Sequence, residues 1–108
     1  QFSNPTFVFN LSELIFKSII VHCEGIFHYG SSDFISRYEF AVLVADIFSF
    51  DKKLILSVDT EYLRNNIQSY VANRPKKSGL ITNKIESVLN IPIYSTKYSL
   101  NQIKNNLS

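Results

Sequence analysis

Apolar residues recur at helical spacing in several parts of the chain, and two of these parts begin with a recognisable helix start. Over 36–48, Ser36 and Glu39 form a capping box of the S-x-x-E type, and apolar residues follow at i, i+3, i+4, i+7 and i+8 (Phe40, Leu43, Val44, Ile47, Phe48). Asn10 stands before a similar pattern. We therefore predict helices over 36–48 and over 11–21, the second with Asn10 as its N-cap.

The second half of the chain holds shorter helical patterns. Apolar spacing predicts helices over 82–90 and 95–107, and a short helical turn ending at Leu63. The residues expected at their N-cap positions are Thr82, Ser95, and either Asp59 or Thr60. Residues 64–79 show no periodicity and include Pro75 and Gly79, which predicts a loop.

Three short runs of β-branched, aromatic and aliphatic residues lie between the predicted helices. They are residues 5–9, 26–29 and 54–58, and each has the length and composition of a strand. The chain has no Asn-Gly pair to mark a tight hairpin between neighbouring strands. Short strands separated by helices predict an α/β fold and exclude a β-barrel or a helical bundle.

Composition narrows the class of protein further. The chain has 108 residues, 45% of them hydrophobic and 19% charged, which fits one folded domain and argues against disorder. The net charge of +2 gives no reason to expect nucleic acid or a membrane as partner. With no methionine and a start at Gln1, we expect a processed chain or a piece of a longer protein. The lone cysteine favours a reducing, cytoplasmic setting.

Few residues form a pattern that carries chemistry. The sequence has no G-x-G-x-x-G, no P-loop and no G-x-S-x-G. His22, His28 and Cys23 have no ligand or base at a useful spacing, so we expect neither a metal site nor a nucleophile. Arg74 precedes a rigid proline and is suited to bidentate phosphate binding, although its spacing alone favours a solvated loop.

Four segments together carry a resemblance to a known family. Residues 4–11 (N-P-T-F-V-F-N-L) resemble S-P-T-y-v-x-D-L-A, 25–30 (G-I-F-H-Y-G) resemble G-i-y-H-v-s-G, and 35–41 (I-S-R-Y-E-F-A) resemble i-S-r-y-E-F-A. Residues 74–80 (R-P-K-K-S-G-L) resemble R-P-x-n-S-x-L, and Thr82-Asn83-Lys84 follow where the pattern has d-t-s-K. These are motifs of the dTDP-4-dehydrorhamnose reductases, in the same order and with agreeing gaps. Asn10 departs from them, since the family usually has Asp there.

The resemblance implies a place for this chain within a larger enzyme. These reductases are extended short-chain dehydrogenase/reductases, and the chain would be the C-terminal part of such a Rossmann-type protein. Residues 1–30 would pack with the missing Rossmann domain, with 26–29 as the last sheet strand, and 31–108 would form a small α/β substrate lobe. NADPH or NADH and the catalytic Tyr-x-x-x-Lys pair would belong to the missing part, so this chain would bind no cofactor and catalyse nothing alone.

The resemblance also implies which residues meet the substrate, a dTDP-linked 4-keto-6-deoxyhexose. Arg74 falls where related extended enzymes place an arginine on the sugar-nucleotide diphosphate. Asn4, Pro5 and Thr6 fall on the segment that enters the substrate cleft.

Other functions remain open at this point. One alternative is a non-catalytic relative, such as the regulatory β subunit of methionine adenosyltransferase, and a weaker one is a free-standing binding domain. Because a lone edge strand would leave backbone groups unpaired, we expect the 108-residue piece to be poorly stable alone.

Overall fold

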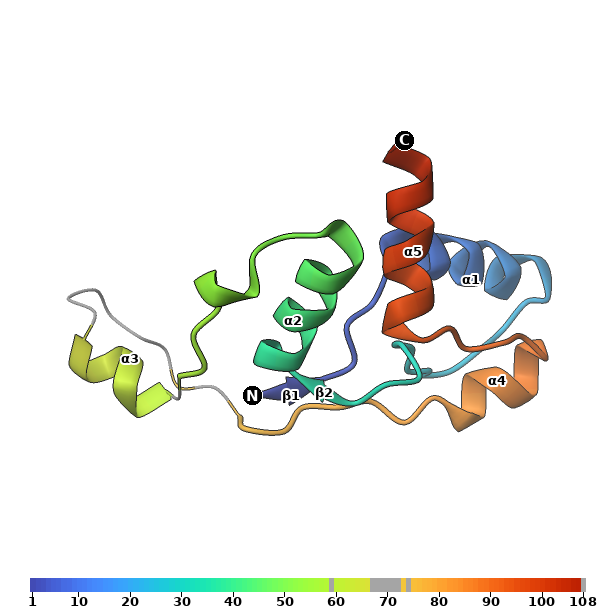
Figure 1. Ribbon diagram of the computed structural model, residues 1–108. Coiled ribbons are helices and arrows are strands. Elements are labelled where there is room, and N and C mark those ends of the chain that lie inside the picture. The colour runs from blue at the N-terminus through green and yellow to red at the C-terminus, as the bar shows by residue number, and fades with distance from the viewer. Residues whose placement is uncertain (59, 67–72, 74, 108) are drawn as a thin grey trace.

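The computed structural model describes residues 1–58, 60–66, 73 and 75–107. The fold is mixed α/β, with mostly helices and one small two-stranded sheet (Figure 1). In chain order the elements are β1 (Phe2–Ser3), α1 (Val8–Ile20), β2 (Ile35–Ser36), α2 (Arg37–Phe48), the 3-10 turn η1 (Lys52–Leu54), α3 (Thr60–Asn66), α4 (Asn83–Leu89) and α5 (Thr96–Leu107).

Helix α2 forms as its sequence predicts. The Ser36 hydroxyl accepts a hydrogen bond from the Glu39 N–H at 3.1 Å, and the Ser36 N–H donates to the Glu39 carboxylate at 3.3 Å. This reciprocal pair satisfies two N–H groups that the first helical turn leaves without partners. At the other end, Ser49 adopts the left-handed conformation and its N–H donates to the Ala45 carbonyl. The capping box prediction is confirmed.

Helix α5 also begins where predicted, and it has a second cap from a distant loop. The Tyr98 N–H donates to the Ser95 hydroxyl at 3.1 Å, which confirms Ser95 as the local cap. In addition, the Thr96 N–H donates to a carboxylate oxygen of Asp33 at 2.7 Å. The Thr96 hydroxyl, almost fully buried, lies 3.2 Å from that of Ser31. Asp33 thereby anchors the start of α5 to the loop before β2.

The start of α1 differs from the prediction. Residues 5–9 form no strand, because α1 already begins at Val8 and Phe7 occupies the N-cap position without a side-chain cap bond. Asn10 therefore lies inside the helix, where its amide donates to the Ser99 hydroxyl on α5 at 3.0 Å. The predicted N-cap role of Asn10 is wrong, because its side chain forms a hydrogen bond to another helix instead.

Helices α3 and α4 also refine the prediction. Thr82 precedes α4 as expected, but its side chain makes no cap bond and its hydroxyl donates to Glu86 at 3.0 Å. Asn90 ends α4 in the left-handed conformation that asparagine tolerates. Helix α3 extends to Asn66, beyond the predicted end. The alternative cap, Asp59, lies outside the described residues.

The other two predicted strands are also wrong. Residues 26–29 and 55–58 belong to no strand, and η1 occupies the start of the 54–58 run. A strand requires a neighbouring backbone to bond with, and among the described residues neither run has one. The strands that do form, β1 and β2, are two residues each and pair antiparallel, with Phe2 opposite Ser36. Strands of two residues are too short to show an alternating hydrophobic pattern in the sequence.

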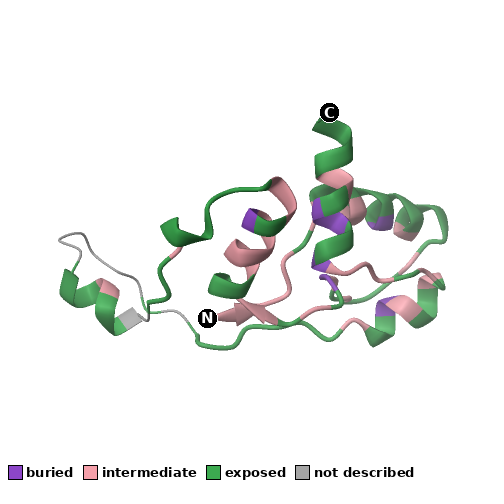
Figure 2. Ribbon diagram, viewed as in Figure 1, coloured by how far each residue is buried: buried purple, intermediate pink, exposed green. Residues whose placement is uncertain are grey.

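The apolar core is small and the molecule is extended. One apolar residue from each of four helices is buried (Figure 2): Leu14, Ala45, Ile85 and Leu100. Helices α2 and α5 pack together, whereas α3 lies at the far end of the molecule from α1 and α5 (Figure 1). The radius of gyration is 16.6 Å, against about 13 Å for a compact domain of similar length. Much apolar surface therefore stays exposed.

Candidate functional site

The N-terminal strand lies between two segments that come much later in the chain. On one side β1 pairs with β2, and on the other it forms a parallel bridge from Phe2 to Lys77. The Phe2 N–H donates to the Lys76 carbonyl at 2.7 Å, and the Ser78 N–H donates to the Phe2 carbonyl at 2.9 Å. The segment that contains Asn4, Pro5 and Thr6 thus continues from a strand bonded to 76–78.

The side chain of Asn4 links three parts of this site. Its carbonyl oxygen accepts from the Leu80 N–H at 2.7 Å, and its amide donates to the Ser31 carbonyl at 3.1 Å. The Thr6 hydroxyl donates to the Asn4 backbone carbonyl at 3.0 Å. Asn4 and Pro5 are half-buried, whereas Thr6 is exposed. Of these predicted substrate-binding residues, Thr6 is the most open to solvent.

Two glycines allow the segments to approach this closely. A Cβ atom added to Gly79 would lie 2.5 Å from the ring of Phe34 and 3.0 Å from the Asn4 side-chain oxygen. A Cβ atom at Gly30 would lie 2.8 Å from the Cβ of Asn4. Both contacts are shorter than side chains tolerate, so only glycine fits without a local shift. The sequence does not single out Gly79 and Phe34, because their contact exists only once the two loops meet.

Arg74, the strongest candidate from the sequence, lies outside the described residues. Residues on both sides of it are described: Pro75, Lys76 and Lys77 are exposed, as the prediction of a solvated loop requires. The hydrogen bonds of Phe2 to Lys76 and Ser78 fix the chain that follows Arg74 against β1. The segment 4–6, predicted to bind substrate, therefore lies beside residues 76–80, which follow the second predicted substrate-binding residue in the chain.

A family model decides the class to which this site belongs. The model of the RmlD substrate binding domain matches residues 1–108, which is the whole chain. The chain belongs to the RmlD substrate binding domain family. This confirms the resemblance to the dTDP-4-dehydrorhamnose reductases. No curated protein and no solved structure matches the chain.

The residues of this RmlD substrate binding domain do not fit a dinucleotide cofactor. Such a site needs a glycine-rich turn whose backbone approaches the pyrophosphate. The chain has three glycines, Gly25, Gly30 and Gly79, at no such spacing. Gly30 and Gly79 pack closely against Asn4. Gly25 has a positive φ of 108° in the loop after α1.

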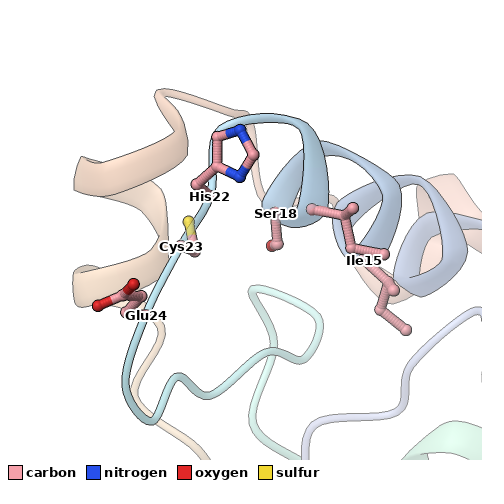
Figure 3. A pocket seen from close by; sticks show the side chains of 6 residues that line it. Ile15, Ser18, His22, Cys23 and Glu24 are labelled. Carbon is pink, nitrogen blue, oxygen red and sulfur yellow. The ribbon is translucent and has the colours of Figure 1, made fainter.

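A shallow hollow of about 410 Å³ lies at the end of α1. Its lining includes His22, Cys23 and Glu24, and Figure 3 shows these side chains on the turn that follows the helix. Over the described residues, no three His, Cys, Asp or Glu side chains gather as a metal site requires. Among the described residues, no helix is both long and apolar enough to span a bilayer.

A second cavity lies between α1 and the segment before α5. It measures about 20 Å³ and includes Glu13, Tyr29 and Tyr94 in its lining. Burial raises the pKa of the Tyr29 hydroxyl, and the neighbouring Tyr94 and Glu13 add to the shift. Tyr29 is therefore uncharged at neutral pH. The cavity has room for about one water molecule and is too small for a sugar nucleotide.

We expect Gly79→Ala to destabilise the protein by about 1–3 kcal/mol, because its methyl group overlaps the Phe34 ring. Urea unfolding of the variant measures this loss. The double variant Gly79→Ala with Phe34→Ala supplies the control, since removal of the ring opens space for the methyl group. Equal stability of Gly79→Ala and the wild type would contradict this close approach.

Proposed function

We propose that this chain is the substrate-binding part of an NAD(P)H-dependent reductase that acts on a dTDP-linked 4-keto-6-deoxyhexose. The family match over residues 1–108 carries the proposal. The juxtaposition of segment 4–6 with the chain after Arg74 supports it, because two separate motifs of the resemblance meet at one place.

In this proposal Arg74 and the segment 4–6 hold the sugar nucleotide. A guanidinium presents a planar fork of donors that matches two phosphate oxygens, and charge assistance makes these hydrogen bonds strong. Arg74 would bind the diphosphate in this way. Asn4, Pro5 and Thr6 would line the cleft beside it, and the oxygen of the exposed Thr6 hydroxyl could accept a hydrogen bond from a sugar hydroxyl.

The cofactor, NADPH or NADH, would be held by another part of the full-length protein. When bound there, it supplies the hydride that reduces the keto group. The residues of this chain do not fit it, so we assign them substrate binding and no catalytic step. A cytoplasmic location is part of the same proposal, because a single cysteine fits a reducing compartment.

The outer face of α1 supports a partner of this kind. Six apolar side chains on this helix are half or more exposed: Val8, Phe9, Ile15, Phe16, Ile19 and Ile20. Helical geometry gathers them into one continuous stripe, while Leu14 and Asn10 face the rest of the chain. An apolar stripe of this size is typical of a buried surface. We propose that the cofactor-binding part of the same protein covers it.

This proposal predicts that the 108-residue chain alone unfolds at low temperature and without a sharp transition. Over the described part of the chain, four buried apolar residues give little hydrophobic stabilisation, and the exposed stripe favours self-association. Differential scanning calorimetry of the isolated chain, beside the full-length protein, measures the difference. A cooperative transition of the isolated monomer at the temperature of the full-length protein would contradict the prediction.

The function itself is tested with the full-length protein. We expect it to consume NADPH or NADH when a dTDP-linked 4-keto-6-deoxyhexose is added, and to leave the cofactor unchanged with the corresponding 4-hydroxy sugar nucleotide. Loss of cofactor absorbance follows the reaction. No turnover of the keto sugar would overturn the proposal and favour a non-catalytic relative such as a methionine adenosyltransferase regulatory subunit.

A further inference from the structure

The side chain of Asn4 extends the hydrogen-bond ladder between β1 and residues 76–80. In a parallel pair of strands, one residue bonds through its N–H and its carbonyl to two residues of the neighbouring strand that lie two positions apart. Phe2 follows this rule, since it accepts from Ser78 and donates to Lys76. The next donor on the later strand is the Leu80 N–H, and it bonds to the side-chain oxygen of Asn4 at 2.7 Å.

Local chemistry explains why a side chain takes this place. The backbone carbonyl of Asn4 accepts from the Thr6 hydroxyl, and Pro5, which follows, has no N–H to offer. The chain then turns into α1 at Val8. The backbone of β1 therefore leaves the ladder here, and the Asn4 carboxamide supplies the missing acceptor.

The other half of the carboxamide fixes Asn4 itself. Its amide donates to the Ser31 carbonyl at 3.1 Å, in the loop that also caps α5 through Asp33. A Cβ atom at Gly30 would lie 2.8 Å from the Cβ of Asn4, and a Cβ atom at Gly79 would lie 3.0 Å from the Asn4 side-chain oxygen. Both polar groups of Asn4 are thus bonded to backbone, and close packing restricts the approach of a ligand to them.

We propose that Asn4 is a positioning residue, which holds residues 76–80 in register with β1 and thereby fixes the segment 4–6 where it lines the substrate cleft. This rests on the proposed function. Asn4 acts through the neighbouring strand and through Thr6, whose hydroxyl donates to the Asn4 backbone carbonyl. Loss of the carboxamide should loosen the strand first, and weaken substrate binding as a consequence.

The experiment compares two Asn4 variants in the full-length protein. Asn4→Leu has a similar shape and removes both hydrogen bonds, whereas Asn4→Asp keeps an acceptor for Leu80 and loses the donor to Ser31. Asn101→Leu is the matched control, because Asn101 is exposed on α5 and bonds only within its own helix. Hydrogen–deuterium exchange of the backbone amides of residues 76–80 is measured without ligand. The affinity for dTDP is measured by isothermal titration calorimetry, well below the melting temperature.

We expect Asn4→Leu to speed hydrogen exchange of the Leu80 amide about tenfold and to weaken dTDP binding by a similar factor, as for loss of one hydrogen bond. Asn4→Asp should keep slow Leu80 exchange and most of the affinity. Asn101→Leu should change neither. Unchanged exchange of α5 amides in each variant would show that the fold is intact.

Three results separate the inference from the proposed function. Slow Leu80 exchange in Asn4→Leu would overturn the inference. Faster exchange with unchanged dTDP affinity would also overturn it, because the strand would not control binding, and the proposed function would stand. If the wild type binds no dTDP, the proposed function fails, while the exchange of Leu80 still decides whether Asn4 holds the strand.

Discussion

Replacing Ile85 with alanine should lower the free energy of unfolding by about 2–4 kcal/mol. Ile85 is 1% exposed and is one of only four buried apolar residues among those described. Removal of its outer carbons loses their burial and leaves a cavity that rigid neighbours fill only in part. In so small a core this is a large share of the total stability of a domain.

The control for Ile85 lies on the same helix. Val88 is also on α4 but is 51% exposed, so Val88→Ala should cost less than about 1 kcal/mol. Urea unfolding of both variants, followed by circular dichroism, measures the two losses under the same conditions. Similar losses would show that α4 does not bury Ile85 as the structure has it.

Replacing Arg74 with alanine should raise the KM for the dTDP-linked sugar about 10–100-fold, with a smaller effect on kcat. One charge-assisted hydrogen bond to a diphosphate contributes about 1.5–3 kcal/mol net of the hydrogen bonds to water that it replaces. The diphosphate does not change during reduction of the keto group, so its contacts stabilise ground state and transition state alike. Steady-state kinetics of the full-length protein, in the reaction proposed above, measure both constants.

Two further variants test whether the guanidinium itself is required. Arg74→Lys keeps the charge and loses the planar fork, so it should recover only part of the affinity. Lys77→Ala removes an exposed charge from the same loop and should have little effect. Equal KM values for Arg74→Ala and Lys77→Ala would show that Arg74 contributes only general positive charge.

The sequence correctly predicted the helices whose capping residues lie within one turn of the helix start. Ser36 and Glu39 lie one helical turn apart, so their capping box requires no distant partner, and the structure forms it as predicted. Ser95 likewise caps α5 through the nearby Tyr98. The family was also determined by sequence, because four motifs occur in one order over the chain.

Distant contacts decided the features that the sequence misassigned. Asn10 has the chemistry of an N-cap, but the approach of α5 gives its amide the Ser99 hydroxyl as partner. Residues 26–29 have the composition of a strand, yet composition does not supply the neighbouring backbone that a strand needs. In both cases the outcome depends on residues far away in the sequence.

The candidate site divides in the same way. The sequence alone marked the segments 4–6 and 74–80, since residue type and motif are local properties. Only the tertiary structure placed the segment 4–6 beside residues 76–80, through hydrogen bonds of Phe2 to Lys76 and Ser78 that span more than half the chain. It also gave Asn4 its two backbone partners, because a carboxamide bonds to whichever donor and acceptor the fold brings within reach.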